Sequence, residues 1–170
     1  MGAQTGAQTG AQEARRREEP ASGPTRRARE TARRRAAGGP PLVLVVDDFK
    51  DGRDLVVETL EHAGFSTAEA ADGPEALSKC RSLRPDLVLM DLSLPGLDGW
   101  EVTRRLRADA ALRGLKVLAL TAHAQVDALE RAREAGADGV ITKPCLPNQV
   151  VARVKEALGA RASAAPEGSD

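Results

Sequence analysis

The 170-residue sequence is poor in the side chains that build disulfide frameworks and zinc sites, with two cysteines and two histidines. Cys80 and Cys145 are too few for a disulfide framework, and their spacing is not that of a metal site. His62 and His123 are the only histidines, so a histidine-built zinc site is not expected.

Long apolar runs are also missing. No stretch approaches the roughly 20 apolar residues that a membrane-spanning helix needs, and the N-terminus lacks the apolar core of a signal peptide. We therefore expect a cytoplasmic protein with no membrane insertion. The phosphate-binding pattern Gly-x4-Gly-Lys-Ser/Thr is absent too, which excludes a P-loop nucleotide-binding protein.

Residues 1–40 contain no Leu, Ile, Val or aromatic side chain, and they begin with a repeated Gly-Ala-Gln-Thr unit. They carry nine Arg against four Glu, a net charge of +5, whereas the other 130 residues carry a net charge of −5. A segment of this composition cannot bury enough surface to offset its ordering entropy, so we expect an Arg-rich, disordered tail. Its Arg clusters suit unspecific attraction to phosphate, but the favoured interpretation is a solvated tail or a start codon assigned too far upstream. No specific DNA binding is expected.

From Pro41 onward, apolar runs alternate with segments of helical periodicity. Four runs are predicted to be buried strands and one, residues 65–70, a weaker and more exposed strand. The five predicted strands are residues 42–46, 65–70, 87–90, 116–120 and 139–142. Five alternations of strand and helix predict one doubly wound parallel α/β domain over residues 41–159, followed by a flexible tail over residues 160–170.

The predicted helices have apolar residues at helical spacing, and Gly or Pro residues mark their ends. We expect Gly64, Pro85, Gly136 and Gly159 to stop four of the helices. The apolar faces are predicted to be Leu55, Val56, Leu60 and Ala63; Ala76, Leu77, Cys80 and Leu83; Trp100, Val102 and Leu106; Val126, Leu129 and Ala132; and Leu146, Val150, Val151, Val154 and Leu158.

Four of the predicted strands deliver polar groups at their carboxyl ends, where ligands gather in an open α/β sheet. These groups are Asp47 and Asp48, Asp91, Thr121 and Lys143. Crowded carboxylates repel unless a cation neutralises them, and Mg²⁺ is commonly held by carboxylates, water and phosphate oxygens. An ammonium and a hydroxyl beside them would contact phosphoryl oxygens. The pattern favours phosphoryl transfer with a carboxylate acceptor.

The sequence from Leu42 to Leu158 resembles the receiver domain of bacterial two-component response regulators. The motifs that carry this resemblance are the acidic pair Asp47-Asp48, Met90-Asp91 with the loop Leu94-Pro95-Gly96-Leu97-Asp98-Gly99, Leu120-Thr121-Ala122, Gly136-Ala137-Asp138-Gly139 and Thr142-Lys143-Pro144. The resemblance implies the flavodoxin-like strand order 2-1-3-4-5.

The resemblance also implies a role for each site residue. Asp91 would be the phosphoacceptor, and Thr121 and Lys143 would bind the phosphoryl group. Mg²⁺ would be held by Asp47 or Asp48, Asp91 and the backbone carbonyl of Ser93. The partner would be a histidine kinase or a histidine phosphotransfer protein, and the Lys143–Pro144 peptide bond would be cis.

One position departs from the family pattern. Val140 occupies a position where many family members carry a Tyr or Phe switch residue, so a coupled movement of Thr121 and an aromatic ring is not expected. His123, two residues beyond Thr121, is interpreted as an exposed loop residue.

The sequence thus predicts a stand-alone regulator, because only about a dozen residues follow Leu158, too few for a helix-turn-helix unit. It would act on a downstream protein through a changed binding surface, or pass its phosphoryl group onward in a relay. One alternative is a receiver-fold adaptor that works without phosphorylation, which Val140 keeps open. Another is a Mg²⁺-dependent aspartyl phosphatase, but Ser93 stands where such enzymes carry a second Asp.

Overall fold

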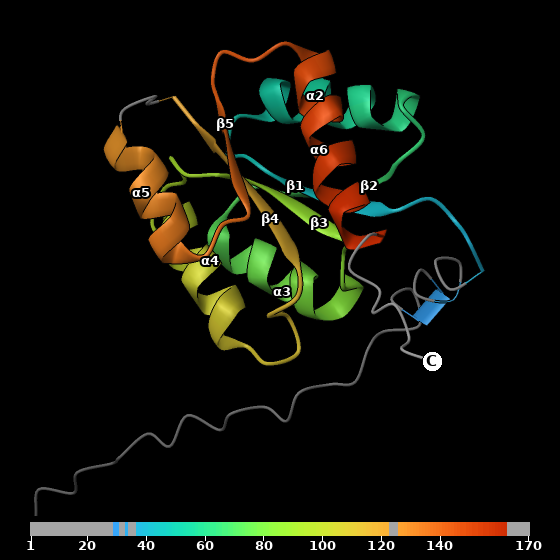
Figure 1. Cartoon of the computed structure of the whole chain (residues 1–170), viewed down its shortest axis with the longest axis horizontal. Helices are drawn as coiled ribbons and strands as arrows, with labels where there is room; N and C mark the ends of the chain where they lie inside the picture. The colour runs from blue at the N-terminus through green and yellow to red at the C-terminus, as the bar shows by residue number, and fades with distance from the viewer. Residues whose placement is uncertain (1–28, 31–32, 34–36, 123–125, 163–170) are drawn as a thin grey trace, which may run out of the picture.

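The computed structural model describes residues 29–30, 33, 37–122 and 126–162. Five strands alternate with five helices after residue 41 (Figure 1). In chain order they are β1 (Leu42–Val46), α2 (Lys50–His62), β2 (Ser66–Ala70), α3 (Gly73–Leu83), β3 (Leu87–Asp91), α4 (Gly99–Ala108), β4 (Lys116–Thr121), α5 (Val126–Ala135), β5 (Gly139–Thr142) and α6 (Pro147–Ala162).

The strands form one sheet in the order β2-β1-β3-β4-β5, with every neighbouring pair parallel. This is the flavodoxin-like order that the resemblance implied. Because all strands run the same way, the residues that follow each strand meet at one edge of the sheet. The carboxyl edge of the sheet is therefore where a ligand site is expected.

Two apolar layers explain why the strand sequences do not alternate. Val43 and Val45 face one layer, with side chains from α2 and α6, whereas Leu44 and Val46 face the other, with side chains from α3 and α4. A strand covered on both faces has to be apolar at every position, and all five residues of β1 are buried. Figure 1 shows α2 and α6 together on one side of the sheet and α3 and α4 on the other. The edge strand β2 is only half-buried over most of its length, as its weaker apolar pattern predicted.

Several predicted helix ends are confirmed. Gly64 and Gly136 follow α2 and α5 with φ angles of 92° and 89°, a backbone conformation that favours glycine. Helix α3 ends at Leu83 and is capped by Arg84, directly before Pro85.

Three expectations for the helices are wrong. Leu55 is 54% exposed and Leu146 is 62% exposed, so neither belongs to an apolar face. The side of α2 that packs against the core carries Val56 and Leu60, and Leu55 lies outside it. Leu146 precedes the first residue of α6. Gly159 does not end α6, because the helix continues to Ala162.

Some expectations fall outside the described residues. They concern residues 1–28, the loop position His123, the side chains of Val126 and Leu129, and residues 163–170. Within the described part of the chain, none of the helices combines the length and the apolar character needed to cross a membrane.

Candidate functional site

The carboxyl ends of β1, β3 and β5 bring three of the predicted residues into direct contact. Asp47 directly follows β1, Asp91 is the last residue of β3, and Lys143 directly follows β5. The Lys143 Nζ atom donates hydrogen bonds of 2.9 Å to Asp47 Oδ2 and of 2.9 Å to Asp91 Oδ2. Both aspartate side chains are almost fully buried, at 6% and 8% exposure. One ammonium therefore neutralises part of a buried carboxylate pair, as buried charges require.

Asp48 completes an acidic cluster beside that lysine. Asp47, Asp48 and Asp91 each offer a carboxylate oxygen within 4.8 Å of the others, and Asp48 alone is exposed. With Lys143 counted, three negative charges and one positive charge leave a net charge of −2 at neutral pH. A donor set made only of oxygens with this charge fits a hard divalent cation such as Mg²⁺. The exposed Asp48 keeps the cluster open to solvent.

Backbone amides fix the two buried carboxylates in place. The Phe49 N–H donates to Asp47 Oδ1 at 2.9 Å, and the Ser93 N–H donates to Asp91 Oδ1 at 2.9 Å. In each carboxylate, one oxygen therefore accepts a hydrogen bond from the backbone of its own loop and the other accepts one from Lys143. This pre-organises both groups, so little rearrangement is needed for a reaction at Asp91.

Opposing effects act on the pKa of the Lys143 ammonium. Burial lowers this pKa, but the hydrogen bonds from Lys143 to Asp47 and Asp91 and the charges of these two residues raise it more, and the net result is a raised pKa. Lys143 is therefore positively charged at neutral pH. The peptide bond between Lys143 and Pro144 is cis, as the resemblance implied.

Thr121 ends β4 at the same edge and is 4% exposed. Its backbone carbonyl accepts a hydrogen bond of 2.7 Å from the Lys143 N–H, and its partner across the sheet is Thr142. The loop that carries Lys143 is thus tied to the end of the neighbouring strand.

The start of α4 lies against the backbone of the site. A Cβ atom on Gly99 would clash with the Asp91 carbonyl oxygen, so only glycine allows this approach. Asp98 caps the helix by accepting a hydrogen bond of 2.8 Å from the Glu101 N–H. The glycine and aspartate that end the loop after Asp91 therefore position α4.

Arg53, on α2, is a site neighbour that the sequence analysis did not single out. Its guanidinium donates to the Asp47 carbonyl oxygen at 2.6 Å and to Glu69 Oε2 at 2.9 Å. The available signal was an arginine on the helix that follows the acidic pair, within reach of it. An arginine on an amphipathic helix is more often solvated, so the sequence alone did not distinguish the two roles.

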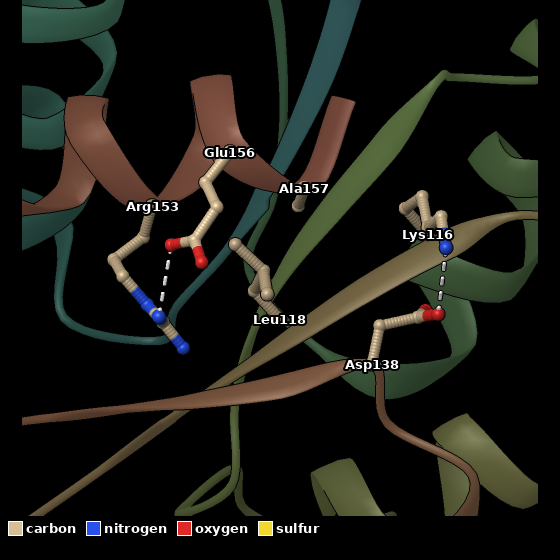
Figure 2. Close-up of a pocket in the computed structure, with 6 residues that line it drawn as sticks. All are labelled: Lys116, Leu118, Asp138, Arg153, Glu156 and Ala157. Atoms are coloured by element: carbon tan, nitrogen blue, oxygen red, sulfur yellow. Dashed lines mark hydrogen bonds and ion pairs between the residues drawn. The ribbon is translucent and has the colours of Figure 1, made fainter. Parts of the chain in front are cut away.

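A hollow at the opposite edge of the sheet is a weaker candidate. It has a volume of about 180 Å³ and lies between β4 and α6. Figure 2 shows that its charged groups are paired with each other, Lys116 with Asp138 at 3.1 Å and Arg153 with Glu156 at 3.0 Å. Because all four of these charged side chains are already in ion pairs, they offer a ligand few unpaired charges. The sheet edge that carries Asp91 is therefore the stronger candidate.

Comparison with known proteins agrees with the fold and the acidic site. A family model described as the response regulator receiver domain matches residues 43–155. The chain belongs to this family, whose members are signalling domains of two-component systems rather than enzymes.

Individual relatives differ in how much of their length is matched. The chain is 44% identical over 116 residues to the DNA-binding response regulator MtrA of Mycolicibacterium paratuberculosis, covering 68% of this chain and 50% of that protein. The chain thus spans about half the length of the first curated relatives it matches. It is 38% identical over 120 residues to the polar-differentiation response regulator DivK of Brucella anthropi, covering 71% of this chain and 98% of that protein.

Solved structures agree. The crystal structure of a putative response regulator from Chloroflexus aurantiacus J-10-fl shares 35% identity with this chain at a TM-score of 0.68. The similarity covers 71% of this chain and 98% of that one. The receiver fold is therefore shared along almost the whole length of that relative.

Proposed function

We propose that the chain accepts a phosphoryl group on Asp91 from the phosphohistidine of a partner protein, a histidine kinase or a histidine phosphotransfer protein. A carboxylate oxygen of Asp91 forms a bond to phosphorus as the bond between phosphorus and the imidazole nitrogen breaks. The imidazole keeps the electron pair of the broken bond and takes up a proton. The phosphoryl group moves as a unit, so the acceptor gains what the donor loses.

The observation that carries this proposal is the pair of 2.9 Å contacts from Lys143 Nζ to Asp47 and Asp91. A positive charge held beside the acceptor carboxylate stabilises the equatorial oxygens of a transferring phosphoryl group. The hydroxyl of Thr121, at the end of β4, is proposed to donate a hydrogen bond to the same oxygens.

Magnesium would be held by Asp47, Asp48, Asp91 and the backbone carbonyl of Ser93. The cation supplies neutralisation of the charge on the phosphoryl oxygens when it is bound. The chain itself contributes orientation, because the backbone amides of Phe49 and Ser93 hold the carboxylates of Asp47 and Asp91 in place.

We further propose that the domain acts as a stand-alone regulator. It would signal through a changed protein-binding surface on α5, β5 and α6, or pass the phosphoryl group onward in a relay. The match to DivK over 98% of that protein supports an output of this kind. The DNA-binding relatives, matched over about half their length, support the receiver chemistry but not this output.

The decisive experiment is intact mass spectrometry after incubation with Mg²⁺ and the small phosphodonor acetyl phosphate. Wild type is expected to gain the mass of one phosphoryl group. The variant Asp91→Asn should gain none, because its amide is not a nucleophile. Asp51→Asn is the matched control, since Asp51 is an exposed carboxylate in the first turn of α2, and it should be modified like wild type.

Each alternative function predicts a different result. If wild type gains no phosphoryl mass even at short reaction times, the proposal fails and an adaptor that works without phosphorylation becomes the better interpretation. Release of phosphate from phosphate monoesters, far beyond one turnover of Asp91, would point instead to an aspartyl phosphatase, because a receiver whose aspartyl phosphate hydrolyses also consumes acetyl phosphate continuously. A gain of mass in Asp91→Asn would place the acceptor elsewhere.

A further inference from the structure

Arg53 contacts the acidic site through the backbone of Asp47, not through its carboxylate. Its side chain is only 12% exposed, although arginine is seldom so deeply buried unless it is paired. The planar guanidinium has two partners, the Asp47 carbonyl oxygen at 2.6 Å and Glu69 Oε2 at 2.9 Å. It therefore links α2 to the end of β1 and to the edge strand β2.

The carbonyl that Arg53 holds belongs to the peptide unit between Asp47 and Asp48. Because a peptide unit is planar, fixing this carbonyl also fixes the direction in which the chain leaves Asp47 toward Asp48. The remaining polar groups of Asp47 are engaged as well: its N–H donates to the Ala70 carbonyl at 3.2 Å, and its carboxylate accepts from Phe49 and Lys143. Arg53 thus contacts the peptide unit that joins the two acidic residues.

Glu69 holds the guanidinium in that orientation. Its own strand is fixed nearby, because Lys79 Nζ donates to the Glu69 carbonyl oxygen at 2.5 Å and to Glu75 Oε1 at 2.6 Å. Arginine suits this position because its rigid fork addresses two acceptors in set directions, whereas a lysine ammonium acts as a point charge.

We infer that Arg53 is a positioning residue for the cation site: by holding the Asp47–Asp48 peptide unit, it sets the affinity of the two acidic residues for Mg²⁺. This inference rests on the proposed function, which gives the acidic cluster its cation. Arg53 itself touches neither the acceptor nor the phosphoryl group.

The sign of the effect separates positioning from plain electrostatics. Arg53 is a positive charge near a cation site, so on charge alone its removal would strengthen Mg²⁺ binding. If Arg53 positions the ligands, its removal weakens Mg²⁺ binding. Loss of an outer contact that orients metal ligands typically costs about 10-fold to 100-fold in metal affinity.

The test is calorimetric titration of the unphosphorylated full chain with Mg²⁺, alongside thermal unfolding of each variant. Arg53→Lys keeps the charge and removes the fork, and Arg53→Met removes both. Each is expected to weaken Mg²⁺ binding by about tenfold or more. Glu69→Gln keeps an acceptor for Arg53 and should weaken binding less. If Arg53→Met does not fold, Arg53→Lys and Glu69→Gln carry the test.

Arg107→Lys is the matched control for a purely structural role. Arg107 is also largely buried, at 21% exposure, and its guanidinium also binds backbone carbonyls and a carboxylate, those of Gly136, Leu115 and Asp138. It lies at the opposite edge of the sheet, where β4 and β5 begin. Its substitution should lower the melting temperature and leave the Mg²⁺ affinity unchanged.

Unchanged or tighter Mg²⁺ binding in Arg53→Lys and Arg53→Met would overturn the inference, as would an equal loss of affinity in Arg107→Lys. Wild type that binds no Mg²⁺ would overturn it too. The proposed function is judged separately, by phosphoryl mass on Asp91. Wild type that binds Mg²⁺ without being phosphorylated would refute the function and leave the role of Arg53 to the titrations.

Discussion

At the scale of single residues, the two cysteines have opposite environments. Cys80 is fully buried between α3 and the sheet, and burial raises the pKa of its thiol to about 12. Cys145 is half-buried and follows the Lys143–Pro144 bond. Since the thiolate is the reactive form, Cys80 is protected from alkylation both because its thiol stays protonated and because it is buried.

We predict that iodoacetamide at pH 8 adds once to the native protein, at Cys145, because roughly one Cys80 thiol in ten thousand is ionised at that pH. Intact mass is the measurement. Cys145→Ser should abolish the native adduct, and guanidinium chloride should expose a second reactive thiol. Two adducts formed at similar rates in the native protein would contradict the buried placement of Cys80.

The site residues named from sequence alone show what residue types can and cannot reveal. The meeting of Asp47, Asp91 and Lys143 was predictable because each stands directly at the end of an apolar strand, and parallel topology brings such ends together. Arg53 was not, because its role depends on a contact with a backbone carbonyl. Carbonyls are identical along the chain, so no sequence pattern marks the one that is held.

At the scale of elements, the strands were easier to predict than the helix faces. A strand buried on both sides is apolar throughout, which leaves little ambiguity in β1 and β3. In α2, Leu55, Val56 and Val57 are consecutive apolar residues, and Val56 and Val57 pack against the core whereas Leu55 is 54% exposed. Val56 and Leu60 are four residues apart and lie on one side of the helix, which leaves Leu55 exposed.

The end of α6 was mispredicted for a related reason. Glycine ends a helix where the chain turns into a left-handed conformation, but on an exposed surface it is also tolerated inside a helix at a cost of about 1 kcal/mol. The residues after Gly159 are Ala160, Arg161 and Ala162, which favour helix, so the helix continues. Composition alone does not decide between these two outcomes.

Gly159→Ala is therefore expected to stabilise the protein by roughly 0.5–1 kcal/mol, because a Cβ atom there meets nothing within 4 Å. Thermal unfolding followed by circular dichroism measures the change. Gly64→Ala is the matched control, since its Cβ atom would also be in open space but its φ of 92° is strained for alanine. That variant should lose roughly 1–2 kcal/mol. A destabilised Gly159→Ala would mean that α6 ends earlier.

At the scale of the whole molecule, charge is divided along the sequence. Residues 1–40 carry a net charge of +5 and the remainder carries −5. The sheet begins at Leu42, and the preceding Pro41 carbonyl accepts a hydrogen bond of 2.9 Å from the Ser66 N–H. A chain that begins at the predicted domain boundary, residue 41, retains this hydrogen bond.

Removal of residues 1–40 is expected to leave the melting temperature unchanged, because their composition offers little apolar surface to bury. Thermal unfolding of the full chain and of the shortened chain, at low and at high salt, is the measurement. A loss of stability at low salt only would show that the tail binds the acidic domain through charge. A loss at both salt concentrations would show that the tail packs against the domain.

The contact between Lys143 and Asp47 joins residues that are 96 positions apart in the sequence. Neither partner finds the other until β1, β3 and β5 occupy the same sheet, so a partly folded chain has no such site. Any ligand that binds there binds the native state alone and stabilises the whole domain by mass action. Occupancy of the site and resistance to unfolding are thus thermodynamically linked. A bound ion or small molecule would therefore also slow degradation by proteases that attack the unfolded chain.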